Sequence, residues 1–121
     1  MRDMAGAEKL KLFSNYENTG NARIKTDEIE ISGGADFAEH FDVISNHTEE
    51  IQAGYLVSID QNSSGKLTIS EHPYDNKLAG IISGANGIRP GMLMGQTGSV
   101  ADGDYPVALS GRVYVFKDNL K

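Results

Sequence analysis

The residues in this sequence that are best suited to take part in a reaction are two carboxylates three positions apart, Asp36 and Glu39. On a single helical turn, side chains at this spacing lie on one face, within several ångström of each other. Two close carboxylates titrate as a coupled pair, which leaves a neutral acid beside a base near neutral pH. Such a pair could protonate a leaving amide and activate water, so the pattern predicts acid–base chemistry.

The same spacing also fits a purely structural role. In a capping box, Asp36 would cap a helical turn and Glu39 would reach back to the Asp36 amide. Phe37 and Phe41 stand four positions apart, which is the spacing of one helical face. Both interpretations therefore predict a single helical turn over residues 35–41, and the sequence leaves them open.

Other reactive residue types lack the spacing that their chemistry needs. The chain has no cysteine, which excludes disulfides, thiolate metal sites and cysteine nucleophiles. His40, His47 and His72 do not have ligand spacing, and Asp102-Gly103-Asp104 does not continue as a calcium loop. The glycine-rich stretches precede no Lys-Ser/Thr pair, so a phosphate loop is not expected. We therefore expect no metal and no cofactor.

Composition narrows the class of protein further. The 121 residues fit one domain. The net charge is −6, and the sequence contains no stripe of basic residues. Residues 1–60 carry 5 Lys/Arg and 12 Asp/Glu, whereas residues 61–121 carry 6 and 5. Such a chain is a poor candidate for nucleic-acid binding, and no apolar run is long enough to insert in a membrane.

The elements that must position these residues are mainly strands. Residues 1–32 predict an extended arm, because Ile29 and Ile31 alternate with Glu28, Glu30 and Ser32 as in a half-buried strand over 23–32. Nothing local supplies a partner for that strand, so an oligomeric neighbour is one candidate. Residues 33–121 predict a compact β-domain.

Within that domain, β-rich runs alternate with turn residues about every ten positions. The predicted strands are Tyr55–Ile59, Lys66–Ser70 with Leu67 and Ile69 inward, Leu78–Ser83 with a bulge or close approach at Gly80, and Tyr105–Phe116. Residues 84–104 are a glycine-rich excursion with a possible short strand at Met92–Met94. The fold class we expect is mainly β: a small barrel or sandwich of short strands with one short helical turn, preceded by an extended β-arm.

Two stretches carry a family resemblance. Ser32–Phe41 is similar to the Gly-x-Asp-x-Ala-Glu-x-Phe signature of the C-terminal intramolecular-chaperone domains of phage tail spikes and neck appendages. Gly54–Asp60, Tyr74-Asp75, Leu78–Gly84 and Pro106–Tyr114 resemble the β-module that follows this signature, in the same order. Related bacterial proteins often continue into a second β-module, which this chain lacks.

The resemblance implies a trimeric domain placed after the β-structured shaft of a fibre. Some members, the second class of peptidase family G, cleave themselves just before the signature Asp and require the Glu three residues later. On this sequence, the resemblance places the scissile bond between Ala35 and Asp36 and the essential carboxyl at Glu39.

The function we expect is therefore a structural fibre or tail-associated domain of a virion. It would promote trimeric assembly and would cap or display the fibre end, with itself and other fibre or tail proteins as partners. One alternative is a self-cleaving intramolecular chaperone that cuts at Ala35–Asp36. Another is a tip that binds a host receptor or glycan, for which the candidate contact residues lie in the excursion: Asn86, Arg89, Gln96, Asp102 and Asp104. The expected location is the virion or the extracellular space.

Overall fold

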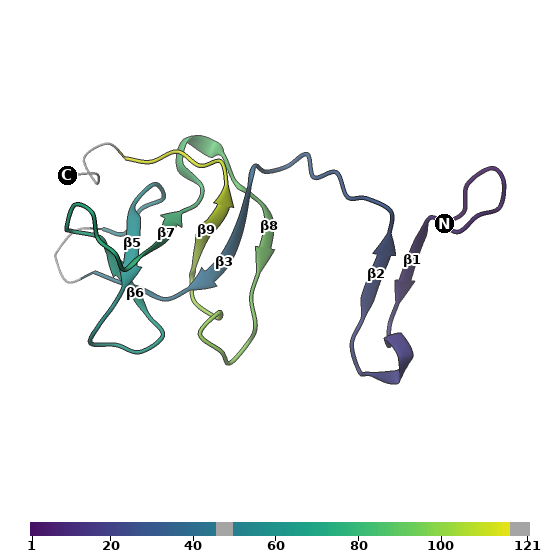
Figure 1. Cartoon of the computed structure of the whole chain (residues 1–121), viewed down its shortest axis with the longest axis horizontal. Coiled ribbons are helices and arrows are strands. Elements are labelled where there is room, and N and C mark those ends of the chain that lie inside the picture. The colour runs from purple at the N-terminus through teal and green to yellow at the C-terminus, as the bar shows by residue number, and fades with distance from the viewer. Residues whose placement is uncertain (46–49, 117–121) are drawn as a thin grey trace. The chain divides into compact units, whose positions relative to one another are not determined.

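The protein is described here from a computed structural model, which covers residues 1–45 and 50–116. The chain forms two units, Met1–Glu30 and Ile31–Lys121, and each is described by itself. Figure 1 shows the strands of both units. The described part of the chain is mainly β and contains two 3-10 turns and no α-helix, so no helix in it could span a lipid bilayer.

The first unit is an antiparallel hairpin of β1 (Leu10–Phe13) and β2 (Arg23–Thr26). A 3-10 turn, η1 (Tyr16–Asn18), lies in the connection between the strands. Phe13 packs edge-on against Tyr16 with ring centroids 5.0 Å apart, and the Arg23 guanidinium lies 3.8 Å above the Tyr16 ring. These contacts fix the turn end of the hairpin.

The predicted strand over 23–32 is therefore only partly right. It ends at Thr26, and its partner is the local strand β1, so the expectation that nothing nearby could pair with it was wrong. The apolar cluster of Leu10, Leu12 and Phe13 supplies that partner. Ile29 and Ile31 lie beyond the strand and are exposed.

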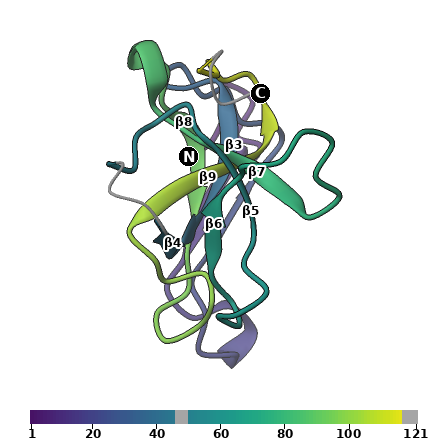
Figure 2. The same cartoon turned by 90° about the vertical axis from the view of Figure 1, so that its left-hand side faces the viewer.

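The second unit is one seven-stranded sheet that curls into a half-barrel (Figure 2). Its strand order is β4-β6-β5-β7-β9-β3-β8. The strands are β3 (Asp36–Phe41), β4 (Val43–Ile44), β5 (Leu56–Ile59), β6 (Leu67–Ile69), β7 (Leu78–Ile82), β8 (Pro90–Met94) and β9 (Tyr105–Gly111). A second 3-10 turn, η2 (Ala85–Gly87), precedes β8.

Most neighbouring strands run antiparallel, and two pairs are parallel. β3 runs parallel to β8 and antiparallel to β9, so it lies between the last two strands of the chain. β4 runs parallel to β6 at the opposite end of the sheet. The edges of the sheet are consequently β4 and β8.

The helical turn expected over residues 35–41 is not present, and this segment is the strand β3 instead. The i, i+4 spacing of Phe37 and Phe41 was too short a pattern to separate a helix from a strand. Pairing with β8 and β9 on both sides satisfies the backbone of β3, which outweighs a weak local helical preference. The helical turns that do form are η1 and η2.

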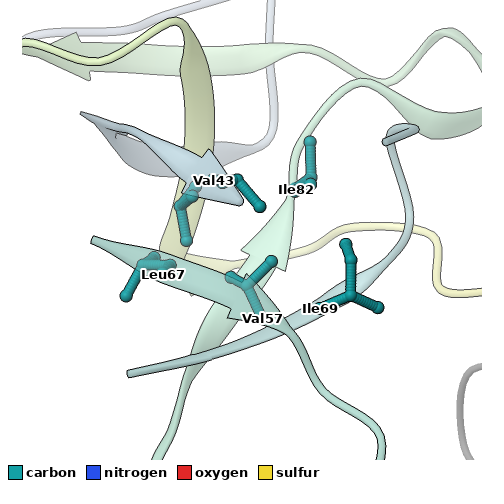
Figure 3. Close-up of a cluster of buried hydrophobic side chains, with 6 residues drawn as sticks. Val43, Val57, Leu67, Ile69 and Ile82 are labelled. Atoms are coloured by element: carbon teal, nitrogen blue, oxygen red, sulfur yellow. The ribbon is translucent and has the colours of Figure 1, made fainter. Parts of the chain in front are cut away.

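The core of the second unit is one cluster of buried apolar side chains. Its buried side chains come from five strands (Figure 3): Val43, Val57, Leu67, Ile69, Ile82 and Val107. The predicted hairpin of β5 and β6 is confirmed, with Leu67 and Ile69 inward as expected. Burial of several Val, Leu and Ile side chains contributes about 1.5–3 kcal/mol for each, which makes this cluster the main source of stability in the unit.

Gly80 on β7 occupies a position where the backbone of the neighbouring strand comes very close. A Cβ at this position would lie 2.4 Å from the Ala108 carbonyl oxygen and 2.8 Å from the Val107 side chain. The β5–β7 ladder is also irregular here, because Val57 pairs with Gly80 and Ser58 pairs with Leu78. The prediction of a bulge or close approach at Gly80 is thus confirmed.

Candidate functional site

Asp36 is the first residue of β3, and it is a buried carboxylate. Its residue exposure is 6%, and both side-chain oxygens are buried with no hydrogen-bond partner among the described residues. A buried polar group without a partner is unfavourable, and such groups in folded proteins call for an explanation. Asp36 is therefore the most unusual side chain in the second unit.

Three glycines and an arginine surround Asp36. Gly111 on β9 pairs with it, and a Cβ on Gly111 would lie 2.6 Å from the Asp36 Cα. A shallow hollow of about 400 Å³ adjoins the residue; its lining includes Gly34, Gly91, Gly111 and Arg112. These glycines allow three separate backbone segments to meet at the carboxylate.

The peptide bond before Asp36 is held in the sheet by its neighbours. The Ala35 N–H donates to the Arg89 carbonyl at 3.0 Å, and the Arg112 N–H donates to the Ala35 carbonyl at 3.1 Å. A second hollow, of about 660 Å³, also reaches Ala35, and Ile81, Ile88 and Tyr114 are among its lining residues. The Ala35–Asp36 bond thus lies between two hollows.

Glu39 does not join Asp36. Successive side chains of a strand point to opposite faces, so residues three apart lie on opposite sides and about 10 Å apart along the strand. The close carboxylate pair and the capping box both required a helical turn, and β3 removes the geometry of both. Glu39 is half-buried and pairs with Met94 and Val107.

The five predicted contact residues divide into two groups. Asn86 and Arg89 precede β8, whereas Gln96, Asp102 and Asp104 follow it. Because β8 has five residues, it separates the groups by about 13 Å along the strand. All five are exposed, and a contact surface made of them stays a prediction.

Two of these residues also hold their own loop together. The Asp102 carboxylate accepts the Gly98 N–H at 2.8 Å, and the Gln96 carbonyl accepts the Ser99 hydroxyl at 2.7 Å. A Cβ on Gly103 would lie 1.9 Å from the Phe41 carbonyl carbon, so this loop packs tightly over the end of β3. Asp102-Gly103-Asp104, which has no calcium-loop pattern, therefore has a packing role here.

The histidines show no shared site. The Nδ1 atom of His40 is buried without a hydrogen-bond partner in the described part of the chain, and a Cβ on Gly95 would lie 2.9 Å from its ring. His72 is exposed, and His47 falls outside the described residues. Within 1–45 and 50–116, no group of three or more histidine or acidic side chains could hold a metal ion.

The pKa of the Asp75 carboxylate is displaced by its neighbours. The backbone N–H of Lys77, which donates to Asp75 at 2.9 Å, is the main cause that lowers its pKa below the ordinary value. The side chain of Ser58 and the charge of Lys77 act in the same direction. These interactions stabilise a loop between β6 and β7, which is consistent with a structural role.

Sequence reasoning found Asp36 but missed its surroundings. Gly91, Gly111 and Arg112 are distant from Asp36 in the sequence, and only the pairing of β3 with β8 and β9 brings them together. The glycines at positions 91 and 111 were the feature of the sequence that could have indicated a close approach of strands here. Comparison of the chain with protein-family models, with curated proteins and with solved structures found no match.

Proposed function

We propose that this chain is a structural assembly module that forms a homotrimer through its first unit and displays its second unit at the end of a fibre. The observation that carries the proposal is the hairpin of β1 and β2. None of the residues Met1–Glu30 is buried, so this unit has no core of its own. An isolated two-stranded hairpin is marginally stable at best in water.

The two faces of the hairpin differ sharply in character. Cross-strand partners share a face, so Leu12 and Ile24 lie on one side and Lys11 and Lys25 on the other. Leu12 is 73% exposed and Ile24 is 65% exposed. An uncovered apolar face beside a charged one is typical of a strand pair that packs against another chain.

Ion pairs do not replace the missing core. Arg2 pairs with Glu8 at 2.6 Å and Lys9 pairs with Asp27 at 3.1 Å, and both pairs are largely exposed. Exposed pairs of this kind contribute about 0–1 kcal/mol each. Equivalent hairpins of other copies would provide the apolar cover. The resemblance to fibre chaperone domains supports a virion or extracellular setting and a trimer.

Native mass spectrometry tests this proposal on the full chain. We expect a trimer of intact chains for the wild type and monomers for the double variant Leu12→Gln/Ile24→Gln, because the variant removes the apolar face. Lys25→Gln, on the opposite face, is the matched control and should remain trimeric. A wild-type monomer at micromolar concentration would refute the proposal.

Self-cleavage is a second candidate, and the buried Asp36 favours it. Asp36 has a carboxyl group with no hydrogen-bond partner in the described part of the chain, and the carbonyl of the preceding residue, Ala35, accepts the Arg112 N–H. A carboxyl group in this position could act as an acid or a nucleophile toward its own preceding peptide bond. Because Glu39 lies on the other face of β3, the geometry favours Asp36 over Glu39 as the reacting group.

Intact-mass measurement during prolonged incubation tests this candidate. If this candidate holds, wild type gives a fragment that ends at Ala35, and Asp36→Asn abolishes it. The Glu39→Gln variant separates the two carboxylates: continued cleavage would leave Asp36 as the reacting group, and loss of cleavage would identify Glu39. Wild-type protein that stays intact under all conditions would remove the candidate.

A further inference from the structure

β8 is a free sheet edge whose protection is confined to its start, where Pro90 has no backbone N–H and the ladder to β3 is irregular between Pro90 and Met92. Its backbone pairs only with β3, and its other side has no partner strand in the described part of the chain. Met92, Leu93 and Met94 are 38%, 48% and 41% exposed, and the sequence from Pro90 to Ala101 contains no charged residue. Natural edge strands are usually blunted by charge, bulges or shortness.

The opposite edge of the same sheet shows what such protection looks like. β4 has two residues, so it offers little backbone for pairing. A charged pair flanks it, with Lys66 Nζ 3.9 Å from the Asp42 carboxylate. The contrast singles out β8 as the edge that is open to another strand.

The segment Glu28–Gly34 spans the boundary between the two units and is not paired with any described strand. From Glu28 to Gly34, no residue makes a hydrogen bond or an ion pair with any described residue. Ile29 and Ile31 alternate with Glu28, Glu30 and Ser32, which is the pattern of a half-buried strand, and both isoleucines are exposed. A strand pattern with an unpaired backbone indicates that its pairing partner lies elsewhere.

The last part of this segment, Ile31 to Gly34, contacts the start of β8 in the same chain. A Cβ on Gly34 would lie 2.3 Å from the Gly91 nitrogen, and one on Gly91 would lie 3.1 Å from the Ile31 side chain. Ile31 and Gly34 therefore lie against Pro90–Gly91 of their own chain, a contact that Ile31 would give up on joining another copy. The free edge along Met92–Met94 is therefore open to residues from another copy.

The segment and the open edge are compatible in charge. The segment Glu28–Ser32 has five residues, and the open part of β8, Met92–Met94, has three. Glu28 and Glu30 would lie beside β8, which has no charged residue. Arg89 precedes β8, and the next acidic residue after it in the sequence is Asp102. Ile29 and Ile31 could share a face with Met92 and Met94, because residues two apart in a strand point the same way.

We propose that residues 28–32 of one copy add to the free edge of β8 in a second copy and form an eighth strand on its sheet. This inference rests on the proposed self-assembly and adds a second contact between copies to that of the hairpins. It is a head-to-tail contact, which closes into a ring when the rotation permits, as in a trimer.

Because the chain has no cysteine, engineered disulfides give a direct test. We expect the full-length double variant Glu30→Cys/Leu93→Cys to form covalent dimers and trimers on oxidation, which reductant reverses. A second pair, Glu30→Cys/Met92→Cys, covers a one-residue change of register. The control pair, Glu30→Cys/Asn76→Cys, uses an exposed loop residue between β6 and β7 and should give no covalent oligomers.

The outcomes separate this inference from the proposed function when the reduced variants are also examined by native mass spectrometry. Variants with a β8 cysteine that are oligomers when reduced, and form covalent dimers and trimers when oxidised, support both the inference and the proposed function. Reduced oligomers with a disulfide only inside one chain, or with none, overturn strand exchange and leave the assembly proposal intact. Reduced monomers overturn both.

Discussion

Ser83 offers a residue-level test of how buried polar groups affect this fold. It follows β7, is 4% exposed, and its hydroxyl has no hydrogen-bond partner among the described residues. Because Ser83→Ala removes an unsatisfied group and keeps the backbone bond to Pro106, we expect the free energy of unfolding to stay the same or rise by about 1 kcal/mol. Urea denaturation measures this change, and exposed Ser110→Ala should have no effect. A clear loss of stability would show that the hydroxyl has a partner.

Asp75 makes stability depend on pH. Because folding lowers its pKa below 3.8, mainly through the Lys77 N–H, Asp75 stabilises the protein above about pH 4. That contribution disappears as the pH falls through the lowered pKa. We expect Asp75→Asn to lower the free energy of unfolding at pH 7, and the difference from wild type to shrink toward pH 2. A difference that persists at pH 2 would contradict this assignment.

At the level of elements, Gly80 fixes the approach of β7 to β9. An added methyl group would lie 2.4 Å from the Ala108 carbonyl oxygen, so one strand must move. We expect Gly80→Ala to lower the free energy of unfolding by about 1–3 kcal/mol, measured by chemical denaturation. Gly33→Ala is the matched control, because nothing lies within 4 Å of the added atom. Equal effects of the two substitutions would refute the packing explanation.

The strands that follow sequence patterns were predictable, and those set by distant pairing were not. The hairpin of β5 and β6 follows from alternating Leu67 and Ile69 beside a polar turn, which is local information. β3 takes its conformation from β8 and β9, which lie some 50 to 75 residues further along the chain. The short Phe37/Phe41 spacing could not reveal that these residues form a strand. The predicted pair of Asp36 and Glu39 depended on the predicted helical turn, so both predictions were wrong.

At the scale of the whole molecule, charge and apolar surface act in opposite directions on assembly. Every copy carries a net charge of −6, and 12 of its 17 acidic residues lie in the first 60 positions. Salt screens repulsion between copies and leaves apolar contact intact. We therefore expect the self-association constant to increase from 50 to 500 mM NaCl, as measured by sedimentation equilibrium. Weaker association at high salt would indicate that ion pairs between copies dominate.

The central position of β3 also dictates the order of events during synthesis. Asp36 pairs with Gly111, so the sheet cannot close until almost the whole described chain has left the ribosome. Contacts between residues so far apart in sequence slow folding, typically to milliseconds or seconds. The hairpin of β1 and β2 needs only the first 26 residues, so it can form well before the second unit. Nascent chains on neighbouring ribosomes would thus present their hairpins to one another while each sheet is still incomplete.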